Sequence, residues 1–320
     1  MTKTSNQGGT DMFLPQGVYV AMVTPFGEEG RVQEDVLRSM VDFLIQKGVH
    51  GLFPVSSVGE SVHLTMEERV RLMRIVAEEA KERVPVTPGV GTTRPDHSIE
   101  LARQAAALGC TAVVAAPPYF YRLSEGMVES YFQTIAQGIP LPMILYNIPL
   151  FTQPISPQVV GRLSLRQNVV GLKESSGSMV ELVHFMDEVR QQGGELSFLS
   201  GREDMFFPAL AMGARGSMTA TACILPEAMV AIYQAWDKGD WTQARELQMA
   251  VVPLIRACFS IPFPLGFKLA MECRGFPMGE PLQPLSIPEA ELLEPARARI
   301  GEILDSTLKA LESPKASGTE

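Results

Sequence analysis

The sequence has 320 residues, of which 46% are hydrophobic and 20% are charged, a composition typical of a globular protein with a large core. This length suits one large α/β barrel or two smaller domains. The formal net charge of −9 disfavours a nucleic-acid partner, which would require a basic surface. An acidic chain can still bind a small anion, because backbone N–H groups and a single lysine make a site locally positive.

The cysteines and the first residues bear on where the protein works. Cys110, Cys223, Cys258 and Cys273 are far apart and form no C-x-x-C pair, so neither a zinc ribbon nor a thioredoxin-type motif is indicated. The polar segment MTKTSNQGGTD (1–11) lacks the apolar core of a secretory signal. No window approaches the roughly 18 apolar residues of a membrane span. We therefore expect a cytoplasmic protein with reduced thiols and no membrane contact.

Short apolar runs, each predicted to be a strand, alternate with longer amphipathic segments. The runs are GVYVAMVTPF (17–26), GLFPV (51–55), PVTPGV (85–90), TAVVAAPP (111–118), PMILYNIP (142–149), NVVGLKES (168–175), LSFLSG (196–201) and ARGSMTAT (214–221). Helical spacing of apolar residues between the runs predicts helices over 32–47, 98–108, 125–137, 157–163, 179–192 and 203–212. One more helix is predicted to begin after Thr65, an N-cap residue followed by two glutamates, and to end near Glu82.

Strict alternation of strands and helices predicts a parallel sheet. Eight such units fit a closed (β/α)8 TIM barrel better than an open sheet, and no G-x-G-x-x-G follows the first strand. After about residue 225 the pattern is helical alone, over 227–238, 241–259, 266–273 and 288–311. The sequence therefore predicts a flexible tail (1–14), a catalytic barrel (15–225), a helical C-terminal domain (226–312) and a second flexible tail (313–320).

Lys173 is the first candidate for catalysis. Reactive side chains of a TIM barrel lie at the carboxyl ends of its strands, and Lys173 follows the apolar run Val169-Val170-Gly171-Leu172. Burial in the barrel would favour the neutral amine, which attacks a carbonyl to form a Schiff base. The alternative is a strand-end lysine that pairs with an acid such as Glu174.

Two neighbouring strand ends carry complementary groups. Tyr146 ends the preceding strand, where its phenol could transfer protons, although it could also be a buried tyrosine with a satisfied hydroxyl. The segment S-S-V-G-E-S (56–61) could present backbone N–H groups and the Ser57 hydroxyl to a carboxylate, or be an ordinary loop. Together the three strand ends suit a reaction that makes or breaks a C–C bond beside a 2-oxo acid. The protonated imine would be the electron sink, so we expect no cofactor and no metal.

These residues belong to a set of motifs that resembles a known family. The motifs are V-T-P-F (23–26), S-S-V-G-E (56–60), P-P-Y-F (117–120), Y-N-I-P (146–149), G-L-K-E (171–174) and S-G-R-E-D (200–204). From about Gly17 to Leu311 the chain resembles the dihydrodipicolinate synthase and N-acetylneuraminate lyase superfamily of pyruvate-dependent class I aldolases. The resemblance implies a (β/α)8 barrel with a helical C-terminal domain, and a homotetramer built as a dimer of dimers.

The resemblance also implies roles for individual residues. It makes Lys173 the Schiff-base lysine and Tyr146 the proton-transferring tyrosine. It makes Ser57, with the backbone of Val58 and Gly59, the turn that binds the substrate carboxylate. Met218, in G-S-M-T, occupies the position at which the family's backbone touches pyruvate.

Three positions depart from the synthase pattern on the side of the second substrate. Val58 stands where the synthase has a threonine, and Phe120 stands where it has a tyrosine that reaches the neighbouring subunit's site. Phe151 stands where it has an arginine that holds the carboxylate of the semialdehyde. These departures build an apolar wall, which suits a less charged or more hydrophobic aldehyde portion.

We therefore expect a lyase that acts on pyruvate or on a small-molecule 2-oxo acid, such as a 2-keto-3-deoxy sugar acid or a 4-hydroxy-2-oxo acid. The alternatives are a 4-hydroxy-tetrahydrodipicolinate synthase with an altered proton relay, or a 2-oxo acid dehydratase or deaminase of the same superfamily. A barrel that has lost catalysis and only binds a ligand is a further alternative. The apolar, proline-rich segment IPFPLGF (261–267) could pack over the barrel or against another subunit.

Overall fold

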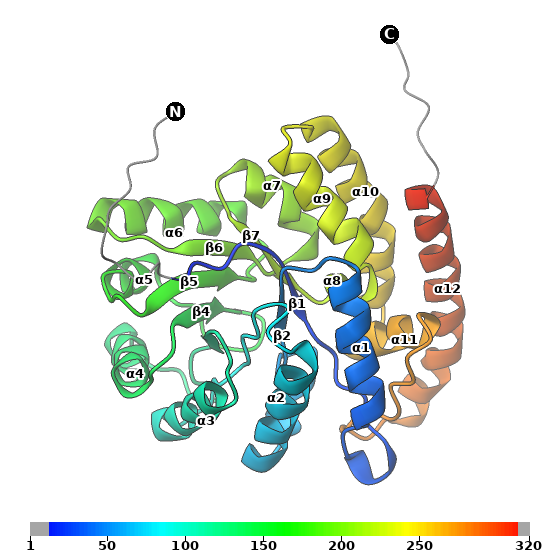
Figure 1. Ribbon diagram of the computed structural model, residues 1–320, viewed down its shortest axis with the longest axis horizontal. Coiled ribbons are helices and arrows are strands. Elements are labelled where there is room, and N and C mark those ends of the chain that lie inside the picture. The colour runs from blue at the N-terminus through cyan, green and yellow to red at the C-terminus, as the bar shows by residue number, and fades with distance from the viewer. Residues whose placement is uncertain (1–12, 313–320) are drawn as a thin grey trace.

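The computed structural model describes residues 13–312, so both predicted tails lie outside the described residues except for Phe13 and Leu14. A curled parallel sheet forms the centre of the molecule, with helices around it (Figure 1). Its strands are β1 (Gly17–Ala21), β2 (Gly51–Phe53), β3 (Val113–Ala115), β4 (Met143–Asn147), β5 (Val169–Glu174), β6 (Ser197–Ser200) and β7 (Gly216–Thr219). Their order is β2-β1-β7-β6-β5-β4-β3, and every pair is parallel.

The segment 85–90 closes the sheet between β2 and β3. Parallel bridges join Leu52 to Val86 and Gly89 to Val114. The segment is not a regular strand because Pro85 and Pro88 have no N–H to give to the ladder, although the carbonyl of each still accepts a hydrogen bond from a neighbouring strand. The predicted (β/α)8 barrel is therefore confirmed, and the irregular segment 85–90 supplies the strand between β2 and β3.

Seven helices and one short turn of helix surround the barrel in the described chain. They are α1 (Glu34–Gln46), α2 (Met66–Ala80), α3 (Pro95–Ala107), α4 (Glu125–Gly138), α5 (Pro157–Leu163), α6 (Met179–Gln192), α7 (Phe206–Ala211) and α8 (Thr221–Ile224). The predicted cap of α2 is present, since the Thr65 side chain accepts from the Glu68 N–H and the Glu68 carboxylate accepts from the Thr65 N–H. The predicted helix over 203–212 is instead a 3₁₀ turn, Glu203–Met205, followed by α7. Pro208 cannot donate to the carbonyl of Asp204, so a continuous α-helix loses that bond.

Four further helices follow the barrel, as the sequence predicts. They are α9 (Pro226–Asp237), α10 (Trp241–Cys258), α11 (Leu265–Cys273) and α12 (Ile287–Glu312). They gather beside α1 and α8 (Figure 1). One continuous hydrophobic cluster joins barrel residues such as Val18 to Leu254 of α10 and Ile300 of α12. No helix of residues 13–312 combines the length and apolar content that crossing a bilayer would require.

Candidate active site

Lys173 and Tyr146 lie side by side at the mouth of the barrel. They are register partners on the parallel strands β5 and β4, so both side chains leave the sheet on the same face. Lys173 is only 4% exposed. Its Nζ lies 4.1 Å from the ring centroid of Tyr146 and 4.8 Å from that of Phe53. The amine therefore sits between two aromatic rings, inside the barrel.

The pairing of Lys173 with Glu174 does not occur. The Glu174 carboxylate instead accepts hydrogen bonds from Asn147 Nδ2 and from the Ser176 N–H, both at 2.6 Å. Burial raises the pKa of Glu174 above its ordinary value, and the two hydrogen bonds offset only part of this rise. Within residues 13–312, the Lys173 amine makes no ion pair and no hydrogen bond, so no protein group competes for it.

The hydroxyl of Tyr146 also lacks a hydrogen-bond partner among the described residues, although the residue is largely buried. Its ring packs edge-on against Phe53, at 6.3 Å between centroids. The alternative of a buried tyrosine with a satisfied hydroxyl therefore does not describe this residue. A phenol beside the amine, with no protein partner, can meet a ligand and exchange a proton with it.

The turn after β2 is held in an uncommon conformation. Val55 and Glu60, at its two ends, have positive φ angles of 56° and 58°. A β-branched residue such as Val55 is strained there, and such strain gathers at functional sites. Gly89 makes the strained backbone possible, because a Cβ on Gly89 would lie 2.2 Å from the Val55 carbonyl oxygen. The turn aims the Ser57 side chain at the cavity that contains Lys173.

The groups of this turn divide into those that build it and those that remain available. The Ser56 hydroxyl donates to the Met22 carbonyl at 2.8 Å. The Gly59 N–H donates to the Ser56 carbonyl at 3.1 Å, and the Gly59 carbonyl accepts from the Thr24 hydroxyl at 2.9 Å. Gly59 therefore shapes the turn and does not line the cavity, whereas Ser57 and Val58 do. The N–H groups of Ser57 and Val58 make no hydrogen bond within the described part of the chain.

Two predicted site residues are not brought to the lysine in this chain. Met218 lies on β7 in register with Tyr19; it is fully buried and lines neither hollow of the site, so the predicted contact of its backbone with pyruvate stays a prediction. Phe120 is 89% exposed and packs edge-on against Tyr121. It lines a separate surface hollow formed with α4.

Two adjoining hollows form the candidate site. A small cavity of about 50 Å³ contains Lys173, and a neighbouring one has about 390 Å³. The residues that line both are Ser57, Tyr146, Ile148, Phe151 and Phe263. Together the hollows have the size of sites for small metabolites, which is roughly 300–1,000 Å³. No group of three or more His, Cys, Asp or Glu side chains suited to a metal is found in residues 13–312.

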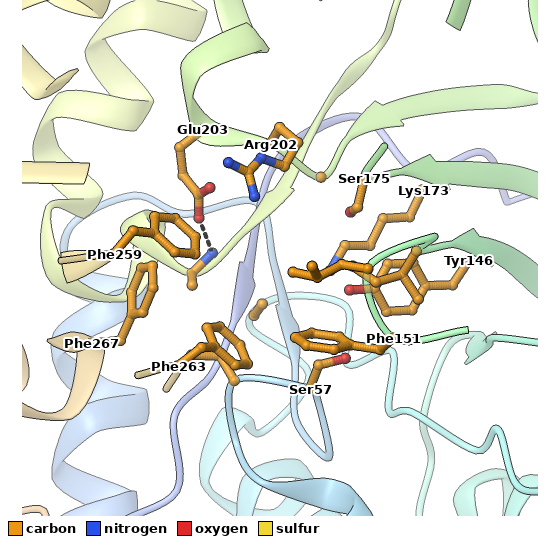
Figure 2. A pocket seen from close by; sticks show the side chains of 16 residues that line it. Ser57, Tyr146, Phe151, Lys173, Ser175, Arg202, Glu203, Phe259, Phe263 and Phe267 are labelled. Atoms are coloured by element: carbon orange, nitrogen blue, oxygen red, sulfur yellow. Dashed lines mark hydrogen bonds between the residues drawn. The ribbon is translucent and has the colours of Figure 1, made fainter. Parts of the chain in front are cut away.

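The structure adds site residues that the sequence prediction missed. Figure 2 shows them around the small cavity: Ser175, Arg202, Glu203, Phe259, Phe263 and Phe267. The segment 261–267 therefore packs over the barrel mouth, where Phe263 lies 5.3 Å from Phe151 between ring centroids. Glu203 is tied to the segment after β7, because its Oε1 accepts hydrogen bonds from the N–H groups of Ala220 and Thr221. The S-G-R-E-D motif (200–204) and the apolar segment 261–267 were the only sequence features that pointed to any of these residues.

Gly201 lets the end of β6 approach the lysine closely. A Cβ at this position would lie 1.9 Å from Ser175 Oγ and 3.0 Å from Lys173 Cε. The Gly201 N–H also donates to the Glu174 carbonyl at 2.7 Å. Lys173 and Ser175 keep their places only because residue 201 has no side chain.

Comparisons with known proteins identify the family of this chain. A family model described as the dihydrodipicolinate synthetase family matches residues 14–301. The 4-hydroxy-tetrahydrodipicolinate synthase of Methanosphaerula palustris is 35% identical over 294 residues, which make up 91% of this chain and 99% of that protein. The enzyme of the same name from Thermodesulfovibrio yellowstonii is 31% identical, and the match covers 91% and 98% of the two chains.

Solved structures give the same relationship. YagE, a prophage protein of the dihydrodipicolinic acid synthase family from E. coli K12, was solved in complex with pyruvate. It matches with a TM-score of 0.85 at 28% identity, over 92% of this chain and 98% of that one. Dihydrodipicolinate synthase from Aquifex aeolicus matches with a TM-score of 0.84 at 27% identity, over 93% and 100%. With a barrel, a buried strand-end lysine and a family match over nearly its whole length, the chain belongs to the dihydrodipicolinate synthetase family of pyruvate-dependent lyases that use a lysine Schiff base.

Proposed function

We propose that Lys173 forms the Schiff base with pyruvate and that Tyr146 transfers the protons of the reaction. The observation that carries this proposal is the Lys173 amine, buried 4.1 Å from the centre of the Tyr146 ring. Neither the Lys173 amine nor the Tyr146 hydroxyl has a hydrogen-bond partner within residues 13–312. The Ser57 hydroxyl and the N–H groups of Ser57 and Val58 supply donors for the pyruvate carboxylate.

The steps follow from these positions. The amine adds to the C2 carbonyl of pyruvate, and water leaves as the protonated imine forms. Loss of a proton from the methyl group gives an enamine, whose carbon attacks the carbonyl carbon of an aldehyde. Tyr146 carries protons to and from the oxygen atoms that change. Hydrolysis of the imine then releases the product and restores the amine.

For the second substrate, we propose aspartate semialdehyde and a 4-hydroxy-tetrahydrodipicolinate synthase activity with an altered proton relay. The names of the similar proteins support this reaction better than cleavage of a 2-oxo acid with an unidentified tail. Aldol cleavage of such a 2-oxo acid is the second candidate, because Phe151 lines both hollows and adds apolar surface there.

We also propose a cytoplasmic homotetramer in which residues 15–225 form the catalytic barrel and residues 226–312 form the helical domain. The exposed aromatic pair Phe120 and Tyr121 supports an interface between subunits, since exposed apolar clusters mark association surfaces. Sedimentation equilibrium of the full chain would measure this state, and a monomer at micromolar concentration would contradict it.

Borohydride trapping tests the Schiff base. The protein is incubated with pyruvate, reduced, digested and analysed by mass spectrometry. We expect a reduced adduct on Lys173, which Lys173→Ala abolishes and which Lys47→Ala, a change at the protein surface, leaves in place. Absence of the adduct from the wild-type protein would refute the proposal. Parallel assays of condensation with aspartate semialdehyde and of 2-oxo acid cleavage then decide between the two reactions.

A further inference from the structure

Arg202 places a second cationic side chain at the cavity that contains Lys173. Its guanidinium Cζ lies 4.9 Å from the centre of the Phe259 ring, over which the cation packs. Its one ion pair within residues 13–312 is a loose contact of 3.8 Å with Asp204, and both side chains are about one-third exposed. The guanidinium donates no hydrogen bond to any described residue, although it carries five donors. Arg202 is therefore held at the cavity with its donors largely unused.

A second polar group without a partner lies nearby. Ser175 is 5% exposed and lines the same cavity, yet its hydroxyl has no hydrogen-bond partner in the described structure. Figure 2 shows Arg202 and Ser175 on the same side of the cavity, across from Ser57 and Phe151. Buried polar groups in native proteins are nearly always satisfied, so each exception calls for an explanation. A ligand with polar atoms at this end of the cavity would satisfy both groups.

The other charged groups of the cavity already have roles. Lys173 becomes the imine, and the Ser57 turn supplies donors for the pyruvate carboxylate. Oε1 of the Glu203 carboxylate accepts hydrogen bonds from the backbone N–H groups of residues 220 and 221. Among the described residues that line this small cavity, only the Arg202 guanidinium is left to balance a further negative charge.

On the opposite wall, Phe151 provides an apolar ring, packed against Phe263. This is the position where the family resemblance leads one to expect an arginine. The cation of this cavity therefore comes from the end of β6 instead of from the segment after β4. A guanidinium pairs well with a carboxylate, because its planar fork can donate two parallel hydrogen bonds.

We propose that Arg202 binds the carboxylate of the aldehyde partner, and so selects an aldehyde acid from the end of β6 instead of from position 151. The Ser175 hydroxyl contacts the polar atoms of that partner. This inference rests on the proposed function and names the residue that selects its second substrate. The new bond joins the methyl carbon of pyruvate to the aldehyde carbon; the methyl group loses one proton and the aldehyde oxygen gains one. The carboxylate held by Arg202 is unchanged in the reaction.

The test compares an aldehyde that carries a carboxylate with the neutral methyl ester of the same compound. Pyruvate consumption is measured with succinate semialdehyde and with its methyl ester, and kcat/KM is determined for each. We expect the wild-type protein to prefer the acid by roughly 10- to 100-fold, the range for a hydrogen bond to a charged group. Arg202→Gln should remove this preference, and Arg202→Lys should keep part of it. Arg190→Gln, the same change at an exposed position of α6, should leave it intact.

Three outcomes would overturn the inference. The first is a wild-type protein that uses the ester as well as the acid, or that uses neither. The second is an Arg202→Gln variant that loses activity with both aldehydes equally, which would indicate a structural role. The third is an Arg202→Gln variant that keeps the preference for the acid. Borohydride trapping of the wild-type protein distinguishes a failure of the proposed function from a failure of the role of Arg202. No adduct would refute the proposed function, whereas an adduct with an unchanged preference in Arg202→Gln would refute only the role of Arg202.

Discussion

Lys268 and Glu60 form an ion pair that fastens the Ser57 turn to the C-terminal helices. Lys268 Nζ lies 2.8 Å from Glu60 Oε1, and the two side chains are 4% and 3% exposed. The other carboxylate oxygen of Glu60 accepts from the Leu282 N–H at 2.9 Å. Burial lowers the pKa of Lys268 below its ordinary value, and the hydrogen bond from Lys268 to Glu60 offsets only part of this fall. The pair therefore holds a strained turn of the barrel against α11.

Replacing Lys268 with Met should destabilise the protein strongly. The Glu60 carboxylate would stay buried, with the Leu282 N–H as its one hydrogen-bond donor and His63 Nδ1 at 3.8 Å. Loss of one partner from a buried ion pair costs about 3–5 kcal/mol, because it leaves an uncompensated charge. The double variant Glu60→Gln with Lys268→Met removes both charges, so we expect it to be more stable than Lys268→Met alone by about 2 kcal/mol or more.

Urea unfolding followed by circular dichroism measures these differences. Lys81→Met is the matched control, because Lys81 is 70% exposed and lies 3.8 Å from Glu79. Such exposed pairs contribute at most about 1 kcal/mol. The reasoning is refuted if Lys268→Met loses no more stability than the control, or if the double variant is as unstable as Lys268→Met.

Three further predictions concern the site and the core. Gly201→Ala should lower kcat/KM by about 100-fold, because the new Cβ displaces Lys173 and Ser175; unchanged steady-state kinetics would contradict this. Tyr146→Phe should keep the borohydride adduct with pyruvate but lower kcat by about 10²- to 10⁴-fold, and an unaltered kcat would exclude its proton transfer. Burial raises the pKa of Tyr131 to about 12, although hydrogen bonds with Ser98 and Thr92 oppose the shift. Because the pKa of Tyr131 is raised in the folded state, the protonated phenol contributes stability that is fully present below about pH 10 and is lost as the pH rises through 12. A titration followed by absorbance at 295 nm should show the ionisation of Tyr131 as a step near pH 12, and the Tyr131→Phe variant should lack this step.

Local sequence signals predicted many element boundaries correctly. Helices α5 and α6 have the predicted bounds, 157–163 and 179–192, because the cap residues Ser156 and Ser178 accept hydrogen bonds from N–H groups three residues later. Lys173 and Tyr146 could be recognised for a similar reason. Each ends an apolar strand, and parallel strands of a barrel present their carboxyl ends at one mouth.

Other features depend on contacts between distant segments, which no local pattern reports. Gly59 was predicted to bind the carboxylate, but Thr24 and Ser56 already use its polar backbone groups. The choice of packing surface for residues 261–267 was open until the fold placed Phe263 against Phe151.

The sequence by itself determined the barrel, the position of the reactive lysine and the family, because these follow from periodicity and short motifs. Only the tertiary structure decided which side chains surround that lysine. Arg202 comes from the end of β6 and Phe259 from the end of α10, and they meet at one cavity because the C-terminal helices pack over the barrel. The charge available to the second substrate is therefore a property of the fold, since it arises from residues that are far apart along the chain.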